Sequence, residues 1–594
     1  MRVVDYIAER LYKMGVKHVF FVPGFGCAYM TDALARHKEL RGVSCHHEQA
    51  AAMAALSYAK YKSSLGACFV TTGCGGTNAI TGLLHAYNDN VPCLFVSGQL
   101  EQKQTLAHFG LPLRQIGKQE ADIIPLVRNL TKYAVTVTDP YDIAYHFDKA
   151  ADLAQSGRPG PVWLDIPLDI QQGPIINENR LKQYVREEVA EQPPVTDSVD
   201  IIMGYIENAE RPVVLAGHGV RLSHSVDEFR EFVHKFRLPV VTSCLGTDLL
   251  DAKDELSIGT AGTLCGSRPG NFAIANSDLV LVLGCRLSIN LTGFRYEHFA
   301  RAARVVVVDI DELEHSKKTV EIDHFIKSDL KPVLRGLSAS AAGGYKEDWI
   351  TKCGHWKKIF PFYSEDDAEA ELINIYYFNE MMSGALKPDS IVISDAGSVF
   401  FSVAASIKIS GGMRSITSGG QAEMGFSLPG AIGACYASGF KETACVTGDG
   451  SIMMNLQELQ TISRGRLPIK IFVINNNGYC SIRNMQNSWF RRTIGTEETD
   501  GLSLPSFEKI AYAFDLPYAK IEKSSVLLDR LNEVLNMEGP VLCEVMCQTD
   551  QMLVAAGHAK NSKNRIAPRP LEDMAPFIDR DLFYKEMIIA PVDD

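Results

Sequence analysis

Short apolar runs alternate with amphipathic helical patterns along most of the chain. The runs are continuously apolar, which indicates strands that are buried on both faces of a parallel sheet. They fall into three blocks, at residues 1–170, 196–345 and 370–555. We therefore predict an α/β protein with three doubly wound parallel-sheet domains in series, followed by a tail at 556–594 that has no clear periodicity.

The predicted strands are well separated by helical or polar segments. One further strand is expected to end near Val43. Two connecting segments have linker composition: QQGPIINENRLKQYVREEVAEQPPV is polar and contains prolines, and GLSASAAGGYKEDW is rich in small residues. The apolar runs are VKHVFFV, GACFVTT, VPCLFVSG and PVWLDIP in the first block, RPVVLAGHG, LPVVTS, DLVLVLG and RVVVVDID in the second, and DSIVISDAG, ETACVTGDG, IKIFVINNN and PVLCEVM in the third.

Composition narrows the class of protein. A length of 594 residues is too great for a single hydrophobic core. The net charge of −12 argues against binding to nucleic acid or to an anionic membrane surface. The chain contains no run of about 18 apolar residues, and its N-terminus lacks the layout of a signal peptide. The 14 cysteines include no Cys-x-x-Cys pair, which indicates reduced thiols in a cytoplasmic protein.

Candidate metal ligands follow two successive strands of the third block. Gly448, Asp449 and Gly450 end the first strand, and Asn476 lies just after the second. A right-handed crossover brings both strand ends to one edge of the sheet, so Asp449 and Asn476 should lie close together. Their oxygens suit Mg²⁺, and the glycines and the following helix start suit a phosphate. Taken separately, the two fragments are better explained by a tight turn and a solvated loop than by a metal site.

Together, Gly-Asp-Gly, the intervening residues 451–474 and the following asparagines resemble the thiamin diphosphate motif of thiamin-dependent enzymes. The resemblance implies that Asp449, Asn476 and the Gly478 carbonyl bind Mg²⁺, which bridges the diphosphate of the cofactor. It also implies that the cofactor lies beside Gly448, Gly450, Ser451 and Tyr479.

A second segment that resembles this family is SCHHEQAAAMAALSYAK, which begins a helix of small residues. Glu48 matches the catalytic glutamate that hydrogen-bonds the aminopyrimidine ring of the cofactor. The alternative is a surface glutamate that caps a helix N-terminus. In the segment TTGCGGTN, Gly73 and Asn78 are expected to hold the loop beside Glu48, and Cys74 replaces the usual proline.

Two further segments resemble the surroundings of the cofactor. In GGQAEMGFSLPGAIGA, Met424 matches the bulky residue that bends the cofactor, and the Ala422 carbonyl would hold its amino group. FVPGFG resembles the loop that covers the thiazolium, with Gly24 and Phe25 beside cofactor and substrate. Pyruvate decarboxylases often have an acid at the position of Phe25. Because Phe25 cannot donate a proton, transfer to a carbon acceptor is favoured over protonation.

The segment HFGLPLRQIGKQEADIIPLVRNLTKY resembles the acetolactate synthase segment that ends in Gln-Glu. Gln119 matches its glutamine, whereas Lys118 stands where the synthases usually have phenylalanine. Arg114, Lys118 and Gln119 are therefore candidate substrate residues, with Gln115 assigned to the cofactor site. A charged loop without a ligand is the alternative.

The central block resembles the flavin-bearing domain of acetolactate synthases. Gly217, Arg221, Arg286 and Asp309 match positions around the nucleotide. Two segments depart from the pattern of the family. Where the family usually has Met-His-Gly this chain has Leu-Cys-Gly, and where the family has Asp-Asp-Arg this chain has Ser-Ile-Asn. FAD, another adenine nucleotide and a purely structural domain therefore remain as alternatives.

The resemblance implies a decarboxylating carboligase that needs thiamin diphosphate and Mg²⁺. It would transfer a two-carbon unit from pyruvate to an acceptor carbonyl. A second 2-oxo acid and a keto sugar nucleotide are the alternative acceptors, and a 2-oxo acid decarboxylase or 2-hydroxyacyl-CoA lyase is a further alternative. A cofactor-binding protein without catalysis is disfavoured by the presence of Glu48, Asp449 and Asn476. The family places the cofactor between two chains, which implies a homodimer or homotetramer.

Overall fold

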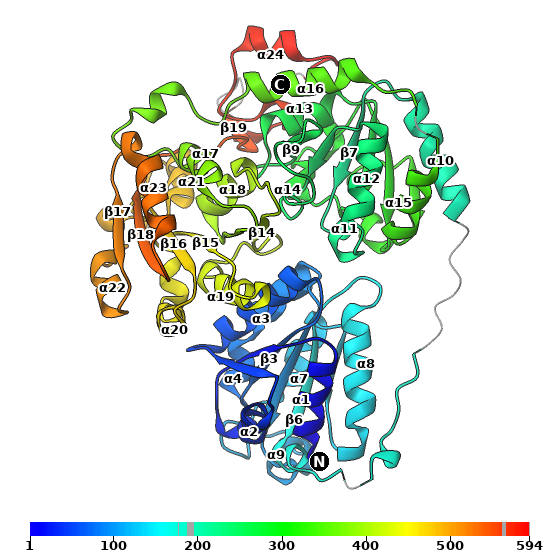
Figure 1. Ribbon diagram of the computed structural model, residues 1–594, viewed down its shortest axis with the longest axis vertical. Helices are drawn as coiled ribbons and strands as arrows, with labels where there is room; N and C mark the ends of the chain where they lie inside the picture. Colours follow the sequence, from blue (N-terminus) through cyan, green and yellow to red (C-terminus); the bar gives the residue numbers. More distant parts are fainter. Residues whose placement is uncertain (176, 187–194, 342, 561–565, 593–594) are drawn as a thin grey trace.

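The computed structural model describes residues 1–175, 177–186, 195–341, 343–560 and 566–592. It contains three six-stranded sheets, each entirely parallel. We call the parts of the chain around these sheets the first, central and third domains. In Figure 1 the first domain lies at the bottom, the central domain at the upper right and the third domain at the left. The predicted fold class of three α/β units is confirmed.

The sheet of the first domain has the strand order β2-β1-β3-β4-β6-β5. Its strands are β1 (His18–Phe21), β2 (Arg41–Ser44), β3 (Gly66–Val70), β4 (Cys93–Gln99), β5 (Tyr133–Thr136) and β6 (Val162–Pro167). Its helices are α1 (Val3–Lys13), α2 (Ala28–Arg36), α3 (Glu48–Lys62), α4 (Cys74–Asn78), α5 (Ile80–Asn88), α6 (Leu106–Phe109), α7 (Ile123–Val127), α8 (Ile143–Gln155) and α9 (Leu168–Gln171).

The third domain repeats this topology, with the strand order β14-β13-β15-β16-β18-β17. Its strands are β13 (Ile391–Ile393), β14 (Arg414–Ile416), β15 (Thr443–Gly448), β16 (Ile469–Asn475), β17 (Tyr518–Ile521) and β18 (Val541–Met546). Its helices are α17 (Ile375–Ala385), α18 (Gly397–Ser406), α19 (Ser427–Ser438), α20 (Glu458–Gly465), α21 (Cys480–Phe490), α22 (Phe507–Ala513) and α23 (Leu527–Asn536).

The central sheet has a different order, β12-β11-β10-β7-β8-β9, in which the winding direction reverses between β10 and β7. Ligands of open α/β sheets bind at such a reversal. The strands are β7 (Pro212–Ala216), β8 (Val240–Thr242), β9 (Ser257–Thr260), β10 (Leu279–Leu283), β11 (Arg304–Asp309) and β12 (His324–Lys327). The helices are α10 (Val195–Asn208), α11 (Gly219–Leu222), α12 (Val226–Phe236), α13 (Arg268–Asn276), α14 (Ile289–Thr292), α15 (Leu330–Ala339) and α16 (Glu347–Ile359).

The tail folds onto the central domain, beside α13 and α16 (Figure 1). It contains β19 (His558–Lys560), β20 (Ile566–Pro568) and α24 (Arg580–Glu586). The Trp356 indole donates a hydrogen bond to Glu586 at 3.0 Å, and the Ile588 amide donates to Asn276 at 2.8 Å. The tail shows no sequence periodicity because its helices and strands are short and are held by contacts with the central domain. Among the described residues, no helix combines the length and apolar character that crossing a membrane requires.

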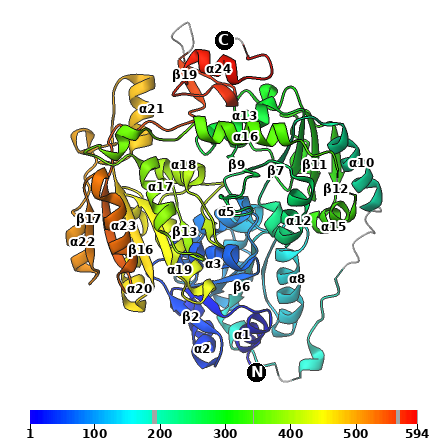
Figure 2. The ribbon, with the colours of Figure 1, turned by 45° about the horizontal axis from the view of Figure 1, so that its top comes forward.

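The first and third domains meet through α3 and α19, which lie side by side in Figures 1 and 2. Most of α3 is buried, because its small side chains let other elements approach it from several sides. A Cβ atom on Gly433 would lie 2.0 Å from the Ala54 carbonyl oxygen. The Ser57 hydroxyl donates to the Gly430 carbonyl at 2.7 Å. The two helices therefore pack backbone against backbone.

Arg414 connects all three domains. Its Nε donates to Asp248 of the central domain at 2.7 Å. Its two other nitrogens donate to the carbonyls of Tyr61 at 3.0 Å and Lys60 at 3.2 Å in the first domain. Asp248 also receives a hydrogen bond from Arg221 at 2.9 Å. Burial opposes the charge of Asp248, but the two arginines outweigh it and lower its pKa to about 2.

We predict that Gly433→Ala lowers the free energy of unfolding by about 1–3 kcal/mol, because the new methyl group forces α19 away from α3. A denaturant titration followed by circular dichroism measures this loss. Gly384→Ala in α17 is the matched control, since no atom lies within 4 Å of its added Cβ atom. Equal transition midpoints for the two variants would contradict the proposed close packing.

Candidate active site

Asp449 and Asn476 lie together at the carboxyl edge of the third sheet. Asp449 follows β15 and Asn476 follows β16, and these strands are neighbours. One Asp449 oxygen, Oδ2, accepts hydrogen bonds from the amides of Asn476 at 3.1 Å and Gly478 at 2.8 Å. The other, Oδ1, accepts one from the Gly450 amide at 2.7 Å. The structure thus brings together the residues that the sequence pairs.

The donor set at this edge fits a hard cation. Asp449 is 1% exposed, and burial raises its pKa to about 6 although three amides donate to it. The Asn476 side chain is buried and has no hydrogen-bond partner among the described residues. The Gly478 carbonyl accepts from the Cys480 amide at 3.0 Å, which leaves it a second lone pair. A carboxylate and two neutral oxygens are ligands that Mg²⁺ prefers.

The residues beside this edge have the features of a phosphate site. Helix α18 begins there, shortly after β13, and the Ser398 hydroxyl lies buried in its first turn. Free amides at a helix N-terminus bind phosphate groups. The Tyr479 ring lies against Gly450, where an added Cβ atom would meet it at 2.3 Å. Gly448 is the last residue of β15, so Gly448 and Gly450 lie at the start of the turn that follows this strand.

Asp395, which was not among the predicted site residues, organises the same edge. It accepts hydrogen bonds from Ser451 at 2.6 Å, Ser427 at 2.9 Å and Thr447 at 3.2 Å. Burial raises the pKa of Asp395 despite these donors. The predicted cofactor residue Ser451 is therefore also a structural link, and it accepts from the Gly425 amide at 2.9 Å. The available signal was the position of Asp395 directly after the apolar run IVIS.

Glu48 begins α3 and is 9% exposed. Its Oε2 accepts a hydrogen bond from the Asn78 side chain at 3.0 Å, so these two predicted residues are in contact. Gly73 adopts a φ of +66°, and an added Cβ atom would lie 2.2 Å from the Gln119 carbonyl oxygen. The loop that carries Gln119 therefore packs on the turn that leads to Asn78.

The loop FVPGFG lies over the end of β3. An added Cβ atom on Gly24 would clash with Thr71 at 2.5 Å, and the Gly26 amide donates to the Thr71 hydroxyl at 3.0 Å. Phe25 projects outward and is 71% exposed. Phe25 therefore presents an apolar ring to the solvent at the carboxyl edge of the first sheet.

Loop 417–425 carries Ala422 and Met424. Ala422 has a φ of +48°, and its amide donates to the Ser418 hydroxyl at 3.0 Å. Met424 is partly exposed. The loop joins the Asp449 edge through Gly425. In contrast, no hydrogen bond or ion pair among the described residues joins Glu48 to Asp449, Asn476 or Gly478. The predicted site residues therefore form two groups within one chain.

The predicted substrate residues lie on an exposed loop. Arg114, Lys118 and Gln119 are exposed, and neither basic side chain has a partner among the described residues. The Gln115 amide contacts the backbone of Glu120. Glu120 shapes this loop by accepting from the amides of residues 116 and 117 at 2.9 and 3.2 Å.

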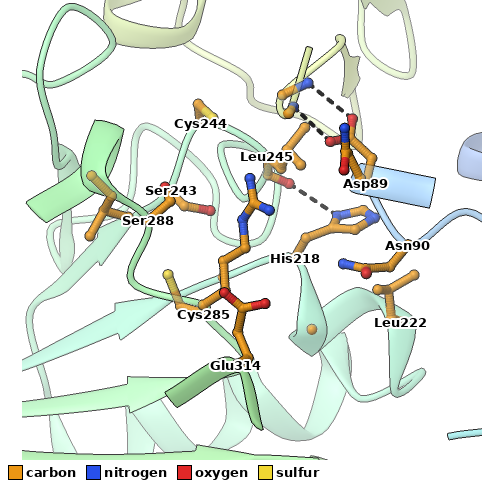
Figure 3. A pocket seen from close by; sticks show the side chains of 18 of the residues that line it. Asp89, Asn90, His218, Leu222, Ser243, Cys244, Leu245, Cys285, Ser288 and Glu314 are labelled. Carbon is orange, nitrogen blue, oxygen red and sulfur yellow. Dashed lines mark hydrogen bonds between the residues drawn. The ribbon is translucent and has the colours of Figure 1, made fainter. Parts of the chain in front are cut away.

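A cavity of about 310 Å³ lies where the three domains meet (Figure 3). Gly217, Arg286 and Asp309 line it, whereas Arg221 does not and instead pairs with Asp248. The guanidinium of Arg286 has no partner among the described side chains. An added Cβ atom on Gly217 would lie 2.2 Å from the Gly284 carbonyl oxygen, so Gly217 is required for packing of the two turns at the winding reversal.

The first-domain wall of this cavity is fixed by Arg158. Its guanidinium donates to Asp311 at 2.8 Å, Glu314 at 2.7 Å and Asn90 at 2.6 Å. Asp309 lies 3.4 Å from the His315 ring. The unpaired Arg286 and the position of the cavity at the reversal fit an anionic ligand such as a nucleotide.

Comparison with known proteins identifies the family. Residues 1–124 match the "Thiamine pyrophosphate enzyme, N-terminal TPP binding domain", residues 199–337 the central domain and residues 395–545 the "C-terminal TPP binding domain" of the same family. The chain therefore belongs to the thiamine pyrophosphate-dependent enzymes. Thiamin diphosphate is accordingly its cofactor.

Among these enzymes the chain is acetolactate synthase-like. It is 32% identical to the acetolactate synthase large subunit of Lactococcus lactis over 554 residues, which cover 91% of each protein. It is 32% identical to chloroplastic acetolactate synthase 3 of Brassica napus and 30% identical to the mitochondrial enzyme of Schizosaccharomyces pombe. Both alignments cover 91% of this chain, and 83% and 82% of those relatives. The chain is thus an enzyme of the transferase or carboligase type.

We predict that Asp449→Asn weakens Mg²⁺-dependent binding of thiamin diphosphate at least about tenfold, because it removes the only anionic oxygen of the ligand set. Calorimetric titration at several Mg²⁺ concentrations measures this effect. Asp389→Asn, at an exposed position before β13, serves as the control and should bind normally. An unchanged Mg²⁺ dependence in Asp449→Asn would exclude this residue as a ligand.

Proposed function

We propose that the protein is a decarboxylating carboligase that transfers a two-carbon unit from pyruvate to an acceptor carbonyl. The observation that carries this proposal is the exposed, apolar Phe25 at the loop over the first sheet edge. Because position 25 carries phenylalanine and not an acid, it has no proton to give to a carbanion, so attack on a second carbonyl is favoured. The acetolactate synthase-like sequence supports the same reaction class.

The chain's own residues have distinct proposed roles. Asp449, Asn476 and the Gly478 carbonyl would hold Mg²⁺, and the start of α18 would face the diphosphate. Glu48 would hold a proton at the aminopyrimidine ring. When bound, thiamin diphosphate supplies the electron sink for loss of CO₂. The Ala422 carbonyl and Met424 side chain, both on loop 417–425, would orient the cofactor.

A keto sugar nucleotide is the second candidate acceptor. Arg114 and Lys118 are exposed and unpaired within the described residues, and they lie on the loop that packs against Gly73. Two exposed cations on this loop would suit an acceptor that carries phosphate groups. A neutral or singly charged 2-oxo acid would make less use of them.

We also propose that the complete site needs two copies of the chain. Glu48 makes its hydrogen bond within the first domain, whereas Asp449 and Met424 belong to the third domain. A homodimer or homotetramer would join the Glu48 group of one copy to the Asp449 group of another. In the central cavity, the unpaired Arg286 supports FAD or another adenine nucleotide as the ligand.

We predict that Glu48→Gln lowers kcat at least about 100-fold, because an amide cannot exchange the proton that a carboxyl group can. Binding of thiamin diphosphate should change little, since the Mg²⁺ ligands are intact. Steady-state kinetics and calorimetric titration measure the two effects. Gln49→Glu in the next position controls for a general change at the helix start. Normal turnover by Glu48→Gln would refute the assigned role.

The products distinguish the candidate reactions. Release of CO₂ from pyruvate should be matched by a product in which the acceptor, either a second pyruvate or an added carbonyl compound, is enlarged by two carbons, as mass spectrometry would show. The acceptors to compare are 2-oxo acids, aldehydes, keto sugars and their nucleotide derivatives. Rapid CO₂ release with aldehyde as the only product would instead show a simple decarboxylase.

Mixing two inactive variants tests the shared site. Random assembly of equal amounts of Glu48→Gln and Asp449→Asn makes half of the dimers mixed, and each mixed dimer has one intact site of two. We therefore predict recovery of about one quarter of wild-type activity after joint refolding or co-expression. Recovery should be absent if both groups of one site come from the same chain.

A further inference from the structure

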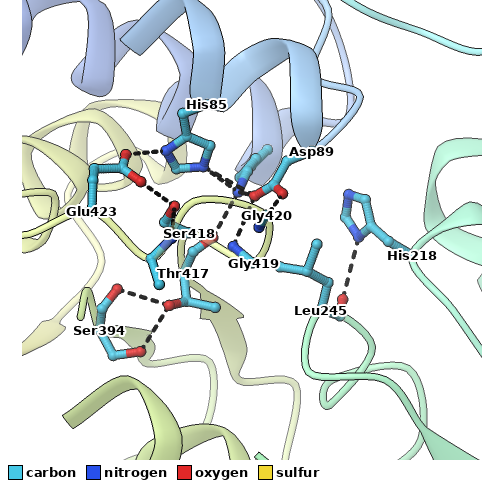
Figure 4. A network of polar contacts seen from close by, with 12 residues as sticks. His85, Asp89, His218, Leu245, Ser394, Thr417, Ser418, Gly419, Gly420 and Glu423 are labelled. Carbon is cyan, nitrogen blue, oxygen red and sulfur yellow. Dashed lines mark hydrogen bonds and ion pairs between the residues drawn. The ribbon is translucent and has the colours of Figure 1, made fainter. Parts of the chain in front are cut away.

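Four ionisable side chains form a buried cluster where the first and third domains meet (Figure 4). Lys60 comes from α3, His85 from α5, Asp89 directly follows α5, and Glu423 lies on loop 417–425. The first three are buried, and Glu423 is only slightly exposed. Such a cluster is costly to bury unless every charge is paired, so its geometry needs an explanation.

His85 is the centre of this cluster. Its Nδ1 lies 2.5 Å from a carboxylate oxygen of Glu423. Its Nε2 lies 2.8 Å from the Lys60 Nζ and 3.1 Å from an oxygen of Asp89. A neutral ring would accept from Lys60 at Nε2, and a cationic ring would donate to Asp89. In both states Nδ1–H donates to Glu423, because a carboxylate can only accept.

The charges in the cluster support one another. Burial opposes ionisation of His85, but the carboxyl groups of Glu423 and Asp89 together outweigh it, so the pKa of His85 is raised. Burial also disfavours the charge of Asp89, yet Lys60 holds its pKa well below the usual value. His85 similarly lowers the pKa of Glu423 against the effect of burial. In the cluster, Lys60 and His85 thus face the carboxyl groups of Asp89 and Glu423.

The cluster also fixes the backbone of loop 417–425. Asp89 accepts hydrogen bonds from the amides of Gly419 at 3.0 Å and Gly420 at 2.7 Å. Lys60 donates to the Thr417 carbonyl at 2.6 Å. These bonds hold the first half of the loop independently of His85.

The second half of the loop depends on Glu423. The Ser418 hydroxyl donates to Glu423 and accepts from the Ala422 amide, which joins the two ends of the turn. Ala422 has a left-handed backbone, which is uncommon for a residue with a side chain. Its conformation must therefore be held by contacts around it, and Glu423 anchors the adjacent position to His85.

We propose that His85 is a positioning residue of the thiamin site: its bond to Glu423 holds the loop in the conformation that presents the Ala422 carbonyl and the Met424 side chain to the cofactor. This role rests on the proposed function of Ala422 and Met424. This role differs from a purely stabilising one. The His85 bond sets how Ala422 and Met424 face the cofactor, and the stability of the domain contact does not depend on it.

Two variants separate these roles. His85→Leu removes both ring nitrogens, whereas His85→Asn keeps an amide donor near the position of Nδ1. His234→Leu is the control, because His234 forms a carboxylate pair with Asp254 at 2.6 Å on the surface of the central domain. All three are made in the full-length protein, and wild-type turnover with pyruvate is measured first.

The first measurement is hydrogen exchange of the cofactor-free protein. In His85→Leu we expect peptides that cover 417–425 to exchange at least about tenfold faster, while α3 and α19 keep wild-type rates. His85→Asn should restore most of the protection. Unchanged exchange in the loop, or equally faster exchange throughout both domains, would overturn the positioning role. This result does not depend on catalysis, so it stands apart from a failure of the proposed function.

The second measurement is turnover of the protein loaded with Mg²⁺ and thiamin diphosphate. A small displacement of a positioning group costs up to about 100-fold in rate. We expect His85→Leu to lower kcat by about this factor with little change in KM for pyruvate, and His85→Asn to recover most of it. Equal losses in both variants, or wild-type kcat in His85→Leu, would overturn the proposal. An inactive wild-type protein would refute the proposed function instead.

Discussion

The direct contact between the backbones of α3 and α19 is the constraint on which the arrangement of the active-site residues depends. At the crossing, even a methyl group on Gly433 would push the helices apart, because it would clash with the Ala54 carbonyl oxygen. Glu48 begins one of these helices, and loop 417–425 leads into the other. A single packing interaction therefore places both the candidate catalytic glutamate and the loop that would orient the cofactor.

The inner strands of each sheet could be predicted from the sequence, whereas most of the edge strands could not. Every apolar run that predicts a strand contains a strand with neighbours on both sides. The strands without a predicting run, such as β5 and β12, are edge strands with partly exposed residues. Since such a strand needs fewer apolar side chains, it leaves little pattern in the sequence. Only β2 was expected among the edge strands, from its place before the Glu48 helix.

The candidate site shows a similar division. Asp449 and Asn476 could be paired from sequence because one helix separates neighbouring strands, so local topology fixes their proximity. Asp395 was missed because its three hydroxyl partners come from distant segments. The contact between His85 and Glu423 joins residues 338 positions apart. No local spacing can predict such a pair, although both residues lie next to recognised motifs.

Loop 417–425 also forms part of the wall of the central cavity. Gly419, Gly420 and Ala422 line the cavity, and Gly425 bonds to Ser451 at the edge of the third sheet. The cavity and the candidate cofactor site therefore share this loop. If occupancy of the cavity favours one conformation of that segment, thermodynamic linkage requires the cofactor to alter the affinity of the cavity by the same factor. A domain that takes no part in bond breaking would thereby set how tightly the vitamin is held.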